Sequence, residues 1–206
     1  MEDVLAVYQL PYDPRYPVVC MDESNKQLVS EVQPPIPAAP GHGLILDHEY
    51  VRHGVATLFV EVEPLAGRRH VEVTERRTRQ DWARFIKAML QERYPQAIKV
   101  RLVMDNLNTH DIASLYETFA PAEARCLAER LEIHYTPKHG SWLNIAEIEL
   151  SALNGQCLRR RIPTSQEMRE DIAAWQSDRN HRGAPVNWRF TTTNARIKLT
   201  RLYPKL

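Results

Sequence analysis

The stretch that decides the fold is Pro17-Val-Val-Cys-Met-Asp22, a short apolar run that ends on a carboxylate. A second run of this kind, Ile98-Lys-Val-Arg-Leu-Val-Met-Asp105, follows later in the chain. Short apolar runs with polar boundaries predict buried strands, so each aspartate is expected at the end of a strand. Strand ends followed by polar residues are where open α/β sheets bind ligands.

A third carboxylate, Glu147, is expected early in a helix that follows Ser141-Trp-Leu-Asn-Ile-Ala. Asn144 and Glu147 also have capping-box spacing, in which the glutamate only reaches back to the backbone. At 100° per residue, however, Glu147 falls among leucines on an apolar side of the helix, where an unpartnered carboxylate is costly. Glu149 points about 200° away, so the two cannot serve one site, and Glu149 is the second choice.

Each of these residues has a structural alternative. Asp22 can form an Asx turn or a cap, and Asp105 can cap a helix that opens at Asn108 and Thr109. His110 can hydrogen-bond a carboxylate or a phosphate, but a structural role is the interpretation favoured for a lone histidine. The order of the three acids on two strands and a late helix is what favours a shared site.

Carboxylate oxygens without cysteine or histidine partners indicate Mg²⁺, with Mn²⁺ as a substitute, over zinc. Two such ions about 3.5–4 Å apart are how proteins cut and join phosphodiester bonds. The sequence therefore predicts a metal-dependent enzyme that acts on nucleic acid.

The remaining patterns predict an α/β fold, a mixed sheet flanked by helices. An apolar snippet and a proline-broken connector fill residues 1–16. Strands are expected at 18–22, 28–32, 55–62, 70–74, 98–104 and 131–135, and helical stretches from Thr78 or Asp81 to 94, across 111–130, at 142–160 and at 165–179.

Composition is that of an ordinary globular chain, with 206 residues, 43% hydrophobic and 26% charged. The chain has no long uncharged apolar stretch and no basic-apolar leader, so neither a membrane span nor a secretory signal is expected. Three widely spaced cysteines fit a reducing cytoplasm. Residues 1–137 hold 15 Lys+Arg against 20 Asp+Glu, whereas residues 138–206 hold 12 against 6. A basic C-terminal third suits a polyanionic substrate, although a solvated helix face would give the same charge run.

The chain resembles the DDE-superfamily endonuclease domain of bacterial insertion-sequence transposases, in the branch related to Tc/mariner elements. The matching strings are VVCMDESNKQL around Asp22, LVMDNLNTH around Asp105 and HYTPKHGSWLNIAEIEL around Glu147, followed by QCLRRRIP and FTTTNARIKLTRLYP. The resemblance implies a ribonuclease H-like fold, with Asp22, Asp105 and Glu147 as catalytic triad and metal ligands. It divides the chain into a linker remnant (1–16), a catalytic domain (17–180) and a basic C-terminal extension (181–206).

The resemblance also implies transposon-end and target DNA as partners, insertion at TA dinucleotides and action as a homodimer in the cytoplasm, at the nucleoid. Lys138, His139 and Trp142 precede the Glu147 helix and are expected to contact the DNA backbone or stack on a splayed base. Core packing is the other interpretation of Trp142. Arg159, Arg160 and Arg161 are expected to contact phosphates.

Two features depart from the family pattern. Family members carry N-terminal helix-turn-helix domains that bind the transposon ends, so this chain is expected to be a fragment, a split reading frame or an excised domain. Gly155 lies in a predicted helix at a cost of about 1 kcal/mol relative to alanine, which suggests decay of a mobile-element remnant. The alternatives to a transposase core are a catalytically silent DNA-binding or dimerising fragment, and a stand-alone ribonuclease H-like nuclease.

Overall fold

The computed structural model describes residues 1–45 and 47–203. The expected basic extension is therefore described as far as residue 203, and Lys205 lies outside the described residues. The strands are β1 (Val18–Glu31), β2 (Tyr50–Glu63), β3 (Arg68–Thr74), β4 (Val100–Met104) and β5 (Leu131–Tyr135). The helices are α1 (Glu2–Tyr8), α2 (Arg79–Ala88), α3 (Ile112–Thr118), α4 (Pro121–Glu129), α5 (Ala146–Gln156), α6 (Ser165–Arg182) and α7 (Thr192–Lys198).

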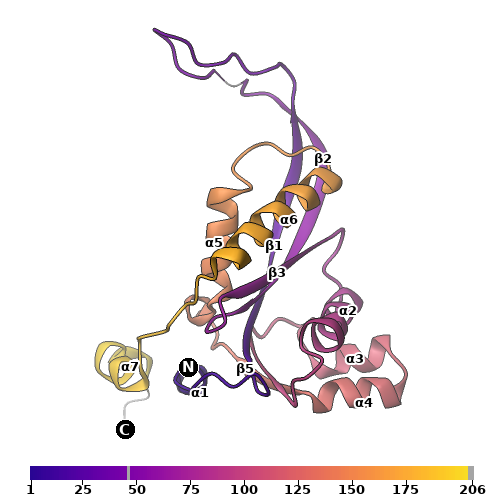
Figure 1. Ribbon diagram of the computed structural model, residues 1–206, viewed down its shortest axis with the longest axis vertical. Coiled ribbons are helices and arrows are strands. Elements are labelled where there is room, and N and C mark those ends of the chain that lie inside the picture. The colour runs from indigo at the N-terminus through magenta and orange to yellow at the C-terminus, as the bar shows by residue number, and fades with distance from the viewer. Residues whose placement is uncertain (46, 204–206) are drawn as a thin grey trace.

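The five strands form one mixed sheet in the order β3-β2-β1-β4-β5. The β1–β2 and β2–β3 pairs are antiparallel, whereas β4 lies parallel to both β1 and β5. Helices α5 and α6 cover one face, and α2, α3 and α4 lie at the other (Figure 1). This confirms the expected ribonuclease H-like α/β fold, a mixed sheet flanked by helices.

Strand β1 runs unbroken through residues 18–31, where the sequence predicted two separate strands. The polar residues between the apolar ends do not stop it, because β2 pairs with it throughout and Asn25 accepts a hydrogen bond from the Thr57 hydroxyl across the pair (3.0 Å). The register shifts between Leu28 and Val29. Beyond that point the hairpin extends away from the sheet as an arm, here residues 29–45 and 47–54 (Figure 1).

Side-chain alternation along β1 supplies two cores. Val19 and Met21 face the side of α2, together with Phe59 of β2. Leu58 and Val60 of β2 face the opposite side and pack against leucines of α5 and isoleucines around α6. Since successive residues of a strand point to opposite faces, Asp22 faces the α5 side and Glu23 faces the α2 side.

The predicted helices are confirmed in position but differ in length. Thr78 caps α2 in a capping box with Asp81, and the predicted apolar face of this helix is buried. A π-helical segment, Met89–Arg93, continues α2 to Tyr94. Helices α3 and α4 divide the predicted 111–130 stretch because Pro121 starts a new helix at its first turn.

The chain ends meet at one end of the molecule, where α1 contacts α7 (Figure 1). Val4, Leu5 and Tyr8 of α1 are buried in a third core cluster, and the Tyr8 and Trp188 rings lie 5.3 Å apart. The domain boundaries at 16 and 180 stay a prediction. None of the helices in the described part of the chain is long and apolar enough to cross a lipid bilayer.

Candidate active site

Asn144 brings the helix with Glu147 to the strand with Asp22. Its side chain is 1% exposed, and its Nδ2 donates to the Met21 carbonyl at 2.7 Å. Its Oδ1 accepts from the backbone N–H of Ala146 at 3.1 Å, in the first turn of α5. The asparagine therefore fixes the start of α5 beside β1. The predicted capping box is absent from α5, whose N-cap is Ile145.

Asp22 is half-buried, and its Oδ1 accepts from the backbone N–H of Glu23 at 2.8 Å. Burial raises the pKa of the Asp22 carboxyl to about 7, against the opposing effect of that hydrogen bond. The negative charges of Asp105, Glu23 and Glu147 contribute to this upward shift. Asp105 and Glu147 thus each lie close enough to Asp22 to act on its carboxyl, although the three acids do not form a tight cluster among the described residues.

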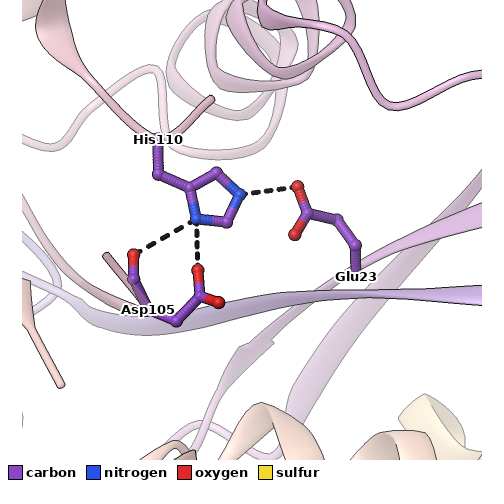
Figure 2. Close-up of side chains that lie close together, drawn as sticks. All are labelled: Glu23, Asp105 and His110. Carbon is purple, nitrogen blue, oxygen red and sulfur yellow. Dashed lines mark hydrogen bonds and ion pairs between the residues drawn. The ribbon is translucent and has the colours of Figure 1, made fainter. Parts of the chain in front are cut away.

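Asp105 directly follows β4, as predicted, and is held by His110 (Figure 2). The His110 Nδ1 lies 2.5 Å from Oδ1 of Asp105 and 3.2 Å from the carbonyl oxygen of the same residue. The Nε2 lies 2.6 Å from Oε1 of Glu23. The hydrogen bond from His110 lowers the pKa of Asp105 below its usual value.

The two carboxylates decide the charge of His110. Burial alone would lower its pKa, but the hydrogen bonds to Asp105 and Glu23 outweigh burial and raise it to about 10. The imidazolium form is therefore the neutral-pH state. Sequence reasoning considered His110 as a carboxylate partner but missed Glu23. The available signal was an acid that follows Asp22 in a buried strand and so needs a partner on the opposite face.

Helix α5 carries two acids with different surroundings. Glu149 is completely buried, and Arg179 donates to it from Nε (3.0 Å) and Nη2 (2.8 Å). Arg69 approaches the same carboxylate at 3.3 Å. Glu147 is instead half-buried at the surface. The prediction that the two acids point apart is confirmed, whereas the prediction that Glu147 is the one embedded in an apolar face is wrong.

An open groove of about 700 Å³ runs along α5 from Glu147. Trp142 lies at one end, 44% exposed, with its ring edge-on to Phe190 at 6.0 Å. The core-packing interpretation of Trp142 is therefore wrong. Small side chains form the middle of the groove. Its lining residues are Trp142, Asn144, Glu147, Ile148, Ser151, Ala152, Gly155 and Gln156.

The predicted cations differ in availability. Lys138 and His139 are exposed, and His139 has a left-handed backbone with φ 61°. Arg160 pairs with two acids of α6 at 2.6 and 2.5 Å. Arg161 pairs with Glu31 and donates to two carbonyls at the base of the arm (2.7 and 2.8 Å). Arg159 is exposed and has no ion-pair partner among the described residues.

A basic pocket of about 390 Å³ lies where α5 ends. It contains Lys26, which is on β1 four residues beyond Asp22, together with Arg159, Arg160 and Arg161. Four residues of strand span about 13 Å, so this pocket lies roughly four phosphate spacings along one strand of a duplex from Asp22. The roles of all these residues stay predictions.

The acidic residues fit a divalent cation. Asp22 is a partly buried carboxyl whose pKa is raised by burial and by neighbouring negative charge, and a cation would relieve that repulsion. Asp22, Asp105 and Glu147 offer only oxygen ligands, the set that Mg²⁺ and Mn²⁺ prefer.

The ribonuclease H-like fold suits a nuclease, and the family comparison agrees. Residues 17–169 match the model of the DDE superfamily endonucleases. The chain belongs to this family. No curated protein matches the sequence.

Solved structures resemble the chain as well. A Mos1 mariner paired-end complex with Mn aligns with a TM-score of 0.58 and 16% identity, over 88% of this chain and 55% of that one. The corresponding complex with Mg gives 0.57 and 16%, over 88% and 56%. The Mos1 strand transfer complex gives 0.55 and 14%, over 82% and 51%. These likenesses show the fold, and the chain spans about half the length of the proteins it resembles.

Proposed function

We propose that the chain is the catalytic core of an insertion-sequence DNA transposase, which cleaves DNA strands and transfers them during transposition. One observation carries the proposal: Asp22, Asp105 and Glu147 come from two adjacent parallel strands and a helix, and Asp105 and Glu147 both lie close enough to Asp22 for their negative charges to raise its pKa. Membership of the DDE endonuclease family supports it. The site of action would be DNA in the cytoplasm, at the nucleoid.

Asp22, Asp105 and Glu147 would hold Mg²⁺, or Mn²⁺ in its place. When bound, two such ions activate the attacking oxygen and stabilise the leaving one. The hydrogen bond from His110 lowers the pKa of Asp105, which favours its ionised form as a metal ligand. Asp22 has a pKa near 7, so it can give up its proton as the cation binds.

The groove along α5 would take the DNA strand that reaches Glu147. Helix α5 has 11 residues and is therefore about 16 Å long, the length of about five phosphate spacings along a duplex. Exposed polar or basic side chains lie at both ends, Lys138 and His139 before Trp142, and Arg159 after Gln156. Trp142 offers an open ring for stacking on an unpaired base.

Arg160 and Arg161 would contact phosphate only by sharing or exchanging their present partners. We therefore assign the main phosphate contact at this end to Arg159; Lys26 lines the same basic pocket but already donates to the Leu158 carbonyl at 2.6 Å.

The arm would mediate dimerisation. Residues 32–45 carry no Asp, Glu, Lys or Arg, and Ile36, Leu44 and Ile45 are each more than half exposed. A neutral apolar surface suits a second protein copy better than polyanionic DNA. The Mos1 relatives are described as paired-end complexes, which supports a homodimer that acts on two transposon ends.

The deciding experiment is an Mn²⁺-dependent nicking and strand-transfer assay that compares wild type with Asp105→Asn. The expected result is wild-type activity on DNA that the variant lacks. Folded protein that binds DNA but never nicks it would favour the silent regulatory fragment. Cleavage confined to RNA–DNA hybrids or branched DNA would favour a stand-alone nuclease.

A further inference from the structure

We propose that Glu23 and His110 are positioning residues that aim Asp105 at the metal ions. The inference rests on the proposed function, in which Asp105 is a metal ligand. It assigns a role to two residues that the proposed chemistry does not itself require. Figure 2 shows the imidazole of His110 lying between the two carboxylates.

Both ring nitrogens of His110 are committed. Carboxylate oxygens accept hydrogen bonds, so Nε2 donates to Glu23 at 2.6 Å. Nδ1 faces Asp105, whose main-chain carbonyl is its hydrogen-bond acceptor at 3.2 Å and whose carboxylate Oδ1 is in ion-pair contact at 2.5 Å. The His110 side chain is 0% exposed and that of Glu23 is 3% exposed, while that of Asp105 is 41% exposed. The three side chains therefore lead from the buried Glu23, through His110, to the solvent-exposed carboxylate of Asp105.

The same three residues do not themselves form an ion site. Their ligand atoms lie within 4.8 Å of one another. However, an ion about 2.1 Å from each of two neighbouring ligands needs those ligands about 3 Å apart. The nitrogen–oxygen distances of 2.5 and 2.6 Å are too short for that, and they are the distances of an ion-pair contact and a charged hydrogen bond.

The loop that follows Asp105 supports its carboxyl only through the backbone N–H of Leu107. Residues 106–108, which follow it, are exposed. The loop closes only at His110, whose backbone N–H donates to Leu107 O (2.8 Å) and whose carbonyl accepts from the Tyr135 hydroxyl (2.8 Å). Trp82 of α2 lies 6.0 Å from the imidazole and fills the space beside it. The two backbone hydrogen bonds and the Trp82 ring fix the position of His110, and His110 in turn fixes the position of Asp105.

The anchor is placed by strand geometry. Asp22 faces α5, and the next residue, Glu23, faces α2. Asp22 is therefore a proposed metal ligand on one face of the sheet, and Glu23 supports a second proposed ligand, Asp105, from the other face. Partners of this kind set the orientation of metal-binding carboxylates, and their loss commonly costs about 10–100-fold in metal affinity.

The test measures Mn²⁺ binding to the whole chain by calorimetry, without DNA. His110→Phe keeps a flat ring beside Trp82 but removes both donors, and Glu23→Leu removes the acceptor at similar volume. Glu23→Gln is the matched control because its amide oxygen still accepts from Nε2. We expect the Mn²⁺ dissociation constant to rise about 10–100-fold in the first two variants, with a smaller rise in Glu23→Gln. Thermal unfolding of each variant is recorded alongside.

An unchanged Mn²⁺ dissociation constant in folded His110→Phe or Glu23→Leu, even with a lower melting temperature, would overturn the inference and leave a purely structural role. If His110→Phe does not fold, the comparison of Glu23→Leu with Glu23→Gln decides. The proposed function has a separate test. If wild type binds Mn²⁺ but does not nick DNA, the proposed function fails, and the comparison of Mn²⁺ affinities among the variants remains valid.

Discussion

Replacing Asp22 with asparagine should stabilise the metal-free protein, although it removes a proposed metal ligand. The folded state holds the pKa of Asp22 near 7, above the ordinary value of 3.8. A group with a raised pKa binds its proton more tightly when folded, so wild-type stability falls as pH rises from about 4 to about 7. Asparagine cannot ionise and escapes this loss.

The size of the effect follows from the shift. One pKa unit is worth about 1.36 kcal/mol, so a displacement from 3.8 to about 7 has an upper limit of about 4 kcal/mol. Asp22 is only half-buried, and we expect about 2 kcal/mol of added stability at about pH 8. For a chain of this size that is roughly 4–8 °C in melting temperature. Most of the gain should vanish at about pH 4.

The assay is thermal unfolding of wild type and Asp22→Asn across this pH range, with and without Mn²⁺. Asp105→Asn is the matched control with the opposite sign, because His110 lowers the pKa of Asp105 and the charged form is the favoured one. Mn²⁺ should stabilise wild type more than Asp22→Asn. A wild type at least as stable as Asp22→Asn at pH 8, or the same pH slope in both proteins, would refute the reasoning.

Three further predictions follow from the helix and the arm. Gly155→Ala should raise the free energy of unfolding by about 0.5–1 kcal/mol, because an added Cβ meets nothing within 4 Å, and should leave DNA cleavage intact. Gly155→Leu should raise KM for DNA, because the larger side chain obstructs the groove. If the two variants have equal KM values, DNA does not pass through the groove. Glu149→Gln should cost about 3–5 kcal/mol in the free energy of unfolding, since it leaves Arg69 and Arg179 without a buried counter-charge, and denaturant unfolding that shows under 1 kcal/mol would contradict this. Arg161→Ala should speed proteolysis between residues 32 and 49 without changing Mn²⁺ binding, because the side chain holds the base of the arm; an unchanged cleavage rate would show that the arm is held by other contacts.

The sequence predicted most of what local patterns determine. Apolar runs placed Asp105 at the end of a strand, and the Thr78–Asp81 cap placed the start of α2. The expectation that Asp22 also ends a strand is wrong, because β1 continues through it to Glu31. The sequence predicted two strands where β1 is continuous, because the pairing that carries the strand through its polar middle comes from β2, more than twenty residues away.

The assignment of burial to the two α5 acids needed information that the helix does not contain. The wheel correctly separated Glu147 from Glu149, but Arg69 on β3 and Arg179 on α6 decide which carboxylate can be buried. The Glu23–His110 pair was missed for the same reason, since its members are 87 positions apart. The exposed Gly155 is better explained by the open groove than by decay of the sequence.

Because Asp22 and Glu23 are neighbours on β1, the proposed catalytic site depends on the register of β1 in the sheet. A slip of β1 by one residue against β2 would exchange the two carboxylates between faces, and the metal ligand and the histidine anchor would be lost together. A misaligned sheet therefore has no partly working site. Recovered nuclease activity during refolding would report the moment at which the strands lock into their final pairing, which burial-sensitive probes such as tryptophan fluorescence need not distinguish from earlier collapse.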